Sequence, residues 1–300
     1  MRQLSRRSFL KFCTASAVGL GLDPFDLTGL GRALANPAGP TVLWLQGSGC
    51  TGCTVSLLNY ISPTAPVDIA DVLINYINLA YAPNLTPVAG ESAVSIIQRV
   101  FETGNYLLAV EGGIPTGFGG GACFAWSVSG VEVTFASAVR DLASRAKAIM
   151  CIGTCSSYGG IPAAPPNPSG VVSVQRLTNR PTINVAGCPP HPDWIVWTIV
   201  QLLLGKTIQL DGWGRPSAIF GRKIHEQCPR KGKPKALSYA IPGLCLKELG
   251  CRGPASHGTC PVSQWNNKAN WCVAANAPCT GCTSPDFPTT RPFYGQEYDH

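Results

Sequence analysis

The sequence predicts an α/β protein in two parts, a doubly wound parallel sheet followed by a smaller region with little regular structure. Two observations carry this prediction. From residue 40 to about residue 205, short apolar runs alternate with longer amphipathic runs, as strands and helices do in a sheet covered on both faces. After residue 205 this pattern gives way to Gly, Pro and Asn, interrupted by cysteines at short intervals.

The elements of the first part can be placed in order. Apolar runs that are too short for buried helices predict strands at 41–46, 105–110, 147–152 and 182–186. Helices are predicted at 55–61, 91–102, 131–144 and 193–204. Because strands and helices alternate, we expect one parallel sheet with helices on both faces, in a flavodoxin-like arrangement. This domain is placed at 36–205 and the smaller one at 206–300.

The first 35 residues are predicted to be a twin-arginine signal peptide. The sequence SRRSFLK at 5–11 is followed by a weakly apolar stretch rich in Gly and Ala, and the sequence ALA at 33–35 supplies a cleavage site. A basic amphipathic helix is the alternative. We expect the mature protein to start near Asn36, to be exported already folded and to be periplasmic. No later run of about 20 apolar residues predicts a transmembrane helix in the mature form.

Composition limits the possible classes of protein. With 45% apolar and 13% charged residues, the chain can bury a sizeable core and is not intrinsically disordered. Its formal charge of +7 first suggests a nucleic acid or a membrane as partner. The predicted leader holds five basic and two acidic residues, so the mature chain retains 18 against 14, a net charge of +4.

The cysteine pattern indicates metal binding rather than disulfides. Of 14 cysteines the mature chain keeps 13, an odd number, and it is long enough to form a core without covalent links. Three pairs have the two-residue gap that lets two side chains reach one metal centre. They are Cys50/Cys53, His225/Cys228 and Cys279/Cys282. Structural zinc is the alternative to iron–sulfur clusters.

Four cysteines follow predicted strands of the sheet. Cys50 and Cys53 follow the first strand, Cys155 the third and Cys188 the fourth. The carboxyl ends of parallel strands lie along one edge, where ligands of open α/β sheets bind. The sequence therefore predicts a four-thiolate centre at this edge. Glu111 follows the second strand, either as a polar interface or proton-network residue or as a carboxylate satisfied by loop N–H groups.

Eight further candidate ligands lie in the irregular C-terminal region. They are His225, Cys228, Cys245, Cys251, Cys260, Cys272, Cys279 and Cys282. The region has too little apolar patterning to fold easily by itself. We therefore expect metal clusters to organise it and to contribute to its folding free energy.

Nine ordered motifs resemble the small subunit of nickel–iron hydrogenases. They are WLQG at 44–47, CTGC at 50–53, VEGGIP at 110–115, GTCS at 153–156, GGIP at 159–162, GCPPHPDW at 187–194, IHEQCP at 224–229, LGCRGP at 249–254 and PCTGC at 278–282. The likeness spans nearly the whole mature chain in the family's order. It is especially close to the periplasmic nickel–iron–selenium branch.

The resemblance implies the electron-transfer subunit of a periplasmic heterodimeric hydrogenase. In this family a separate large subunit splits H2 into two protons and two electrons at a nickel–iron site. The small subunit conducts the electrons to an external carrier, a cytochrome or another redox protein. The chain would therefore belong to an enzyme without holding its catalytic residues.

The resemblance also implies three iron–sulfur clusters and their ligands. A proximal 4Fe–4S cluster would be held by Cys50, Cys53, Cys155 and Cys188. A distal 4Fe–4S cluster would be held by His225, Cys228, Cys245 and Cys251. The alternative for His225 is an ordinary surface histidine.

The third, medial cluster is where this sequence departs from most of the family. Most members bind a 3Fe–4S cluster there through three cysteines, matched here by Cys260, Cys279 and Cys282. Cys272 stands where those members have proline. A fourth thiolate can hold a fourth iron, so we predict a medial 4Fe–4S cluster with a lowered potential. The alternative is that Cys272 packs as a small apolar residue.

Other cysteine positions carry weaker implications. Oxygen-tolerant members have two extra proximal cysteines, at positions that are Gly52 and Gly160 here, so that mechanism should be absent. Cys151 lies in an apolar strand and should be a buried small residue. The sequence assigns no role to Cys123, which could be a core residue or could lie near a cluster.

A basic stretch brackets two of the predicted distal ligands. It consists of Arg222, Lys223, Arg230, Lys231, Lys233 and Lys235, with Glu226 as the opposing charge. One interpretation is a solvated loop. The other is the electron-exit face, where a basic rim would attract an acidic redox partner and repel a lysine-rich cytochrome.

Two other functions would also explain part of the cysteine pattern. A quinone-reductase-type iron–sulfur subunit would explain the proximal quartet but not residues 225–282. A protein held together by zinc or disulfides would be colourless.

Bound clusters would change the net charge of the protein. Three clusters with their thiolates would contribute a charge of about −5. The loaded protein would then be nearly neutral, and no nucleic-acid partner is expected.

Overall fold

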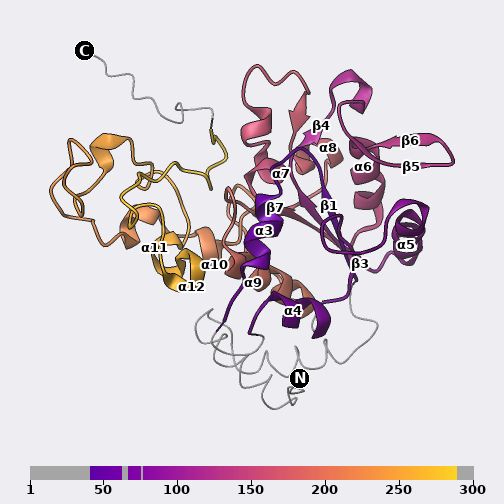
Figure 1. Cartoon of the computed structure of the whole chain (residues 1–300), viewed down its shortest axis with the longest axis horizontal. Coiled ribbons are helices and arrows are strands. Elements are labelled where there is room, and N and C mark those ends of the chain that lie inside the picture. Colours follow the sequence, from indigo (N-terminus) through magenta and orange to yellow (C-terminus); the bar gives the residue numbers. More distant parts are fainter. Residues whose placement is uncertain (1–40, 63–66, 76, 289–300) are drawn as a thin grey trace.

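The computed structural model describes residues 41–62, 67–75 and 77–288. The predicted leader and the last twelve residues lie outside this range. The centre of the first part is a sheet of five strands in the order β2-β1-β3-β7-β9, and every pair in it is parallel (Figure 1). The strands are β1 (Thr41–Gln46), β2 (Leu79–Tyr81), β3 (Tyr106–Glu111), β7 (Ala148–Ile152) and β9 (Ile183–Val185).

This strand order is the flavodoxin-like one, because the second strand lies outside the first and the remaining three follow on the other side. The predicted fold class is confirmed. The four predicted strands are present with ends shifted by one residue at most, and Glu111 is the last residue of β3 instead of following it. The fifth strand, β2, was missed because three residues are too short a run to give a periodic signal.

Helices cover both faces of the sheet. One face packs against α3 (Gly52–Leu58), α4 (Ile69–Asn75) and α9 (Pro192–Leu203). The other packs against α5 (Gly90–Thr103), α6 (Phe135–Arg145) and α8 (Val174–Thr178). Successive side chains of a strand point to opposite faces, so Val42 and Trp44 belong to the first core and Leu43 and Leu45 to the second.

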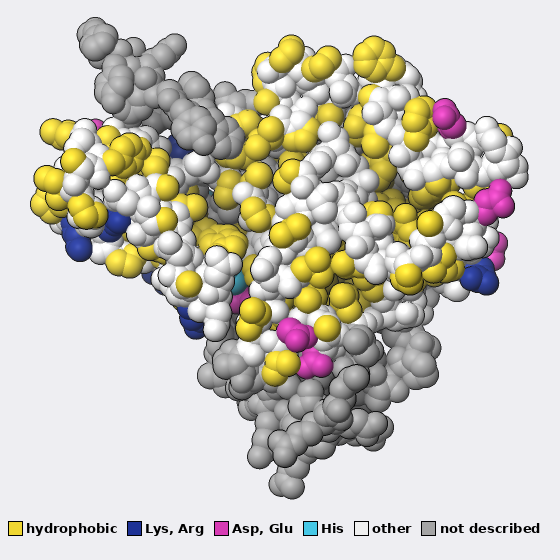
Figure 2. All heavy atoms as spheres, viewed as in Figure 1, with side chains coloured by type: hydrophobic (Ala, Val, Ile, Leu, Met, Phe, Trp, Pro, Cys, Tyr) yellow, Lys and Arg dark blue, Asp and Glu magenta, His cyan; other side chains and the backbone are white. Residues whose placement is uncertain are grey.

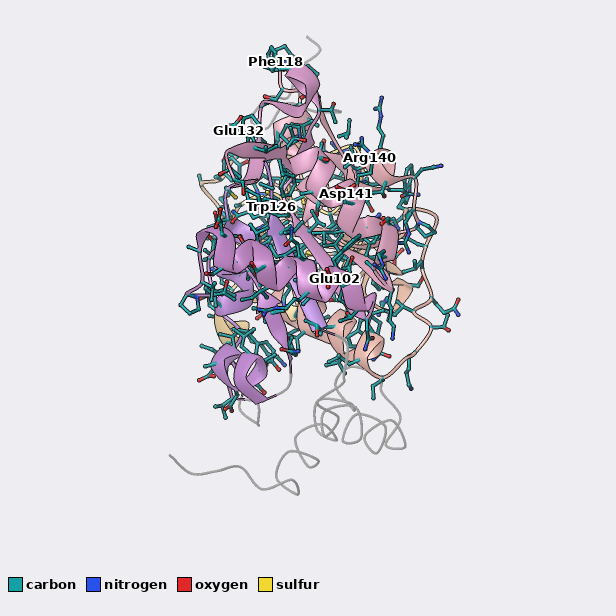
Figure 3. All side chains as sticks on the ribbon, turned by 90° about the vertical axis from the view of Figure 1, so that its right-hand side faces the viewer. Glu102, Phe118, Trp126, Glu132, Arg140 and Asp141 are labelled. Carbon is teal, nitrogen blue, oxygen red and sulfur yellow. The ribbon has the colours of Figure 1, made fainter. Side chains whose placement is uncertain are left out.

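One predicted helix starts in the wrong place. Residues 131–134 form strand β6 (Val131–Thr134), which pairs antiparallel with β5 (Phe124–Val128), and helix α6 begins only at Phe135. The side chain of Thr134 caps α6 by accepting a hydrogen bond from the N–H of Ser137 at 3.1 Å. Figure 3 shows this face of the molecule, where Glu102, Arg140 and Asp141 are exposed on α5 and α6.

Short elements connect the main ones. Strands β4 (Ile114–Pro115) and β8 (Val171–Val172) form a small antiparallel pair. Helix α7 (Thr154–Tyr158) follows β7 directly, and the 3-10 turns η1 (Gly117–Gly120) and η2 (Ile161–Ala163) lie in the loops. Among the described residues no helix is long and apolar enough to cross a membrane.

The C-terminal region is irregular, as predicted, and lies beside α9 (Figure 1). Its described residues, 206–288, form the short elements α10 (Ser217–Phe220), η3 (Ile224–Gln227), η4 (Lys247–Leu249), α11 (Cys260–Ser263) and α12 (Trp265–Lys268). Its buried residues Phe220, Leu246 and Trp271 nevertheless belong to the same apolar cluster as Trp194 of α9. Apolar packing against the sheet domain therefore holds this region in place, in addition to whatever its cysteines bind.

Candidate metal centres

The four cysteines predicted at the sheet edge lie together. Cys50 and Cys53 occupy the turn from β1 into α3, Cys155 lies in α7 directly after β7, and Cys188 follows β9. Burial raises the pKa of Cys53 well above its ordinary value, and the charges of Glu111, Cys155, Cys188 and Cys50 raise it further. Burial, then Cys188 and Cys50, raises the pKa of Cys155 to about 12. Four thiolates this close repel one another, so the group is disfavoured when ionised and without a cation. A metal centre would replace the protons and balance the negative charge.

Two glycines leave space for this group. Gly153 has a φ of +91°, and a Cβ there would lie 2.5 Å from Sγ of Cys53. Gly160 has a φ of +55°, and its Cβ would lie 3.1 Å from Sγ of Cys155. Only glycine meets both the backbone conformation and the lack of space at such positions. The chain therefore keeps side chains away from the two sulfurs.

Glu111 holds the Cys53 segment by its carboxylate. Its Oε1 accepts hydrogen bonds from the N–H groups of Cys53 at 3.0 Å and Thr54 at 3.2 Å. Its Oε2 accepts from the indole Nε1 of Trp44 at 3.1 Å and from the hydroxyl of Thr54. The side chain is buried, with 1% of the residue exposed. This geometry fits the interpretation of a carboxylate satisfied by neighbouring N–H groups, which here belong to the first turn of α3.

A second group contains His225, Cys228, Cys245 and Cys251. Burial raises the pKa of Cys228, and Cys251 and Cys245 raise it further, whereas the N–H of Arg230 lowers it. The N–H of Arg230 lies 3.4 Å from Sγ of Cys228. His225 comes from η3, and a Cβ on Gly253 would lie 3.8 Å from its Cβ and 3.6 Å from Sγ of Cys251. The imidazole and three thiols therefore share one region.

The third group contains Cys260, Cys272, Cys279 and Cys282. Burial raises the pKa of Cys260 well above its ordinary value, followed by the charges of Cys282, Cys279 and Cys272. Cys272 is exposed, whereas Cys260 and Cys279 are buried. Cys272 thus affects the other cysteines of this group electrostatically, and burial, followed by the charge of Cys251 from the second group, in turn raises the pKa of Cys272.

Each of the three groups has four candidate donors. Among the residues that the structure describes, no three His, Cys, Asp or Glu side chains surround a point where one metal ion would sit. Each group instead offers four sulfur or imidazole donors, the chemistry that iron–sulfur clusters require.

Hydrogen bonds connect the first group to the third, and the third to the second. The Thr154 hydroxyl donates to the carbonyl of Cys282 and accepts from the N–H of Gly187 at 2.9 Å. Burial raises the pKa of Cys282 to about 12, opposed by a hydrogen bond from the backbone of Cys188. The N–H of Cys279 lies 3.4 Å from Sγ of Cys251. Thr154 therefore bridges the first and third groups, and a hydrogen bond between two cysteines joins the third group to the second.

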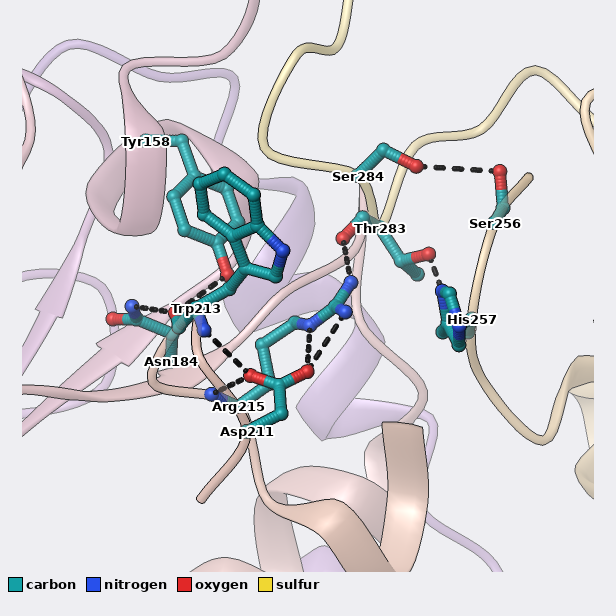
Figure 4. Close-up of polar contacts among 9 residues, drawn as sticks. All are labelled: Tyr158, Asn184, Asp211, Trp213, Arg215, Ser256, His257, Thr283 and Ser284. Atoms are coloured by element: carbon teal, nitrogen blue, oxygen red, sulfur yellow. Dashed lines mark hydrogen bonds and ion pairs between the residues drawn. The ribbon is translucent and has the colours of Figure 1, made fainter. Parts of the chain in front are cut away.

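A buried arginine joins the C-terminal segment to the sheet domain. Arg215 pairs with Asp211 at 2.8 Å and donates to the carbonyl of Thr283 at 3.0 Å (Figure 4). Thr283 in turn donates to the carbonyl of His257 at 2.7 Å. Neither Thr154 nor Arg215 was singled out from sequence, because nothing in a lone threonine or arginine shows which distant carbonyl it reaches.

Two cysteines lie apart from the three groups. Cys151 is fully buried in β7, as predicted for a small core residue. Burial raises its pKa to about 12, and a hydrogen bond with Thr182 opposes the rise. Cys123 is half-buried against the core beneath α5 and α6, which answers the question that its sequence left open.

Two expectations about the basic stretch at 222–235 are wrong. Arg230 is only 9% exposed, and its Nη1 donates to the carbonyl of Leu244 at 3.1 Å and to Oδ1 of Asn276 at 2.9 Å. It supports the loop internally instead of forming part of a solvated rim. Lys235 pairs with Glu248 at 2.6 Å, so Glu226 is not the sole opposing charge.

Curated relatives match the chain over almost its whole length. The periplasmic NiFeSe hydrogenase small subunit of Desulfomicrobium baculatum is 41% identical over 98% of this chain and 99% of its own. The chain belongs to the nickel–iron hydrogenase small subunits. The periplasmic NiFe hydrogenase small subunit of Solidesulfovibrio fructosivorans is 38% identical over 98% of this chain and 93% of its own.

Solved structures agree with this membership. A NiFeSe hydrogenase from Desulfovibrio vulgaris Hildenborough has a TM-score of 0.80 at 37% identity, covering 88% of this hydrogenase subunit and 99% of that chain. The NiFeSe hydrogenase of Dm. baculatum also reaches 0.80, at 41% identity, over 86% of this chain and 99% of that one.

Family models distinguish the predicted function from its rival. Residues 50–202 match NADH ubiquinone oxidoreductase, 20 Kd subunit, which corresponds to the quinone-reductase interpretation. Residues 220–294 match the C-terminal region of the NiFe/NiFeSe hydrogenase small subunit. The second match covers the part of this hydrogenase subunit that the rival function left unexplained.

Proposed function

We propose that this small subunit conducts electrons between a nickel–iron site in a large subunit and an external redox carrier. Three iron–sulfur clusters, when bound, would supply one-electron carriers. The proximal cluster would be held by Cys50, Cys53, Cys155 and Cys188; the distal one by His225, Cys228, Cys245 and Cys251; the medial one by Cys260, Cys272, Cys279 and Cys282. The hydrogen bonds that connect adjacent groups, through Thr154 and between Cys279 and Cys251, are the observation that carries this proposal.

Exposed apolar side chains beside Cys50 support a heterodimer. Val55 and Leu58 of α3 are 51% and 41% exposed, and Ile161, next to Gly160, is 46% exposed. Large apolar side chains gathered around a site that must accept electrons are typical of an interface with another subunit. We assign this edge of the sheet to the large subunit.

We also propose a periplasmic location reached by twin-arginine export. Relatives in this family are named as periplasmic, and the leader at 1–35 has the paired arginines that this pathway requires. A pathway that carries folded proteins would allow the clusters to be inserted before export. The large subunit would then cross the membrane attached to this chain.

The function can be tested on the heterodimer purified after co-expression with its large subunit. We expect broad visible absorption, iron and acid-labile sulfide equivalent to three clusters, and H2-driven reduction of a viologen dye. Cys53→Ala should lose iron from the proximal site and dye reduction, whereas Cys123→Ala, outside the three groups, should retain both. Colourless protein, or zinc in place of iron, would refute the proposal.

Thr154 is expected to act as a positioning residue between the proximal and medial groups. Thr154→Val keeps the side-chain volume but removes the hydroxyl, leaving the N–H of Gly187 and the carbonyl of Cys282 without this partner. We expect a loss of about 2 kcal/mol in unfolding free energy and altered proximal and medial signals in electron paramagnetic resonance. Thr154→Ser should restore both. Identical spectra for the Val and native proteins would show that the hydroxyl does not position the clusters.

A further inference from the structure

The loop between Cys228 and Cys245 presents a row of apolar side chains to solvent. Leu237 is 86% exposed, Ile241 61% and Tyr239 50%. In Figure 2 the C-terminal lobe shows hydrophobic and basic side chains next to one another. Exposed apolar clusters of this kind on a folded protein mark a surface that another molecule covers.

The loop is held firmly, so this exposure is a fixed feature of the fold. The N–H of Ala236 donates to the carbonyl of Cys245 at 2.8 Å. Arg230 ties the two ends of the loop together through Leu244, and Asn276 donates to the carbonyl of Tyr239 at 3.3 Å. The apolar side chains therefore stand on a supported backbone and are available without rearrangement.

The segment that carries these side chains has a net positive charge, although Arg230 is buried and Lys235 is paired with Glu248. Residues 222–250 contain seven Lys and Arg against two Glu, a net charge of +5. The whole chain from residue 36 carries +4, so the remainder is slightly negative and the positive charge is concentrated here. Lys231 and Lys233 are exposed beside the apolar row. An apolar centre with a charged rim is the usual composition of a transient protein interface.

Resting on the proposed function, we infer that this surface, formed by Leu237, Tyr239, Ile241, Lys231 and Lys233, docks an acidic redox protein. The chain segment that bears it begins and ends at two proposed distal ligands, so a carrier bound here would be next to the electron exit. Positive charge would speed its encounter and select against lysine-rich cytochromes, while the apolar row would hold it. This surface thus determines the class of electron acceptor.

The test uses the intact heterodimer and compares two protein acceptors. H2-driven reduction of an acidic ferredoxin and of a lysine-rich c-type cytochrome is measured against ionic strength, with a viologen dye as reference. We expect the ferredoxin to react faster at low salt and to slow as salt is added. Lys231→Glu with Lys233→Glu should lower its kcat/KM about tenfold, and Leu237→Ser should lower it without changing the salt dependence.

Matched controls lie on the side of the sheet domain that faces away from the C-terminal region (Figure 3). Arg140→Glu and Phe118→Ser change an exposed cation and an 81% exposed aromatic residue there, and should leave ferredoxin reduction unchanged. Equal losses in these controls, preference for the basic cytochrome, or binding of the loop to anionic lipid vesicles would overturn the docking inference. Failure to reduce the viologen would instead refute the proposed function, and the inference with it.

Discussion

Replacing Cys272 by alanine is expected to change the type of the medial cluster. The oxidised native protein should show no stoichiometric 3Fe–4S signal in electron paramagnetic resonance, and Cys272→Ala should produce one. The reason is that Cys272 interacts electrostatically with Cys260, Cys279 and Cys282 and, in the proposed cluster, would supply the fourth thiolate. Since Cys272 is exposed, removing its sulfur should cost little packing energy.

The same variant should raise the potential of the medial site, because one negative thiolate is lost. A redox titration followed by electron paramagnetic resonance measures this shift. Cys123→Ala is the control, since its half-buried thiol lies away from all three groups. A stoichiometric 3Fe–4S signal in the native protein, or an unchanged spectrum in Cys272→Ala, would contradict the four-ligand assignment and favour a packing role for this cysteine.

Replacing Glu111 should have the largest effect on stability. Glu111→Ala leaves the N–H groups of Cys53 and Thr54 and the indole of Trp44 without their acceptor in a buried site. Because each unsatisfied buried donor costs about 1–3 kcal/mol, we expect a loss of about 3–5 kcal/mol. That corresponds to a decrease of about 10 °C in Tm, measurable by circular dichroism. Iron should be lost first from the proposed proximal site, since Cys53 is the proposed ligand whose backbone Glu111 holds.

Two further variants separate the charge of Glu111 from its shape. Glu111→Gln keeps the side-chain volume but turns an amide NH2 group towards hydrogen-bond donors. Its loss of unfolding free energy should therefore lie between zero and that of Glu111→Ala. Glu132→Gln, in the exposed β5–β6 hairpin, should change the unfolding free energy by no more than about 0.5 kcal/mol. A Glu111→Gln protein as stable as the native one would mean that water can satisfy these donors.

The parts of the fold that periodicity determines were predicted well. β1 and β3 are continuous apolar runs buried on both faces, so their sequences leave little alternative to a central strand. Residues 131–134 were misassigned because Val131 lies four residues before Phe135 and so fits the apolar spacing of α6, although Val131 and Val133 alternate as in a strand. What decides the boundary is the cap at Thr134 and the pairing with β5, a contact made across a turn.

The candidate ligands were visible in the sequence because cysteine spacing is a local property. The residues that place them were not. Arg230 looks like any other cation of its basic stretch, yet its guanidinium reaches Leu244 and Asn276. Thr154 differs from other threonines only in facing a carbonyl 128 positions later in the chain. Such roles depend on tertiary distance, for which a single sequence has no signal.

The loop at 211–215 has a second consequence, for the solubility of the folded chain. β9 is an edge strand, and an open edge can pair with a strand of another molecule. Here the N–H of Asn184 donates to the carbonyl of Gly214 at 2.7 Å, and its side chain donates to the carbonyl of Trp213 at 2.8 Å. The loop therefore occupies the outward backbone N–H of Asn184, at the centre of β9, which could otherwise pair with another strand. The ion pair of Asp211 with Arg215 holds this loop in shape, and the loop in turn covers the β9 edge of the sheet.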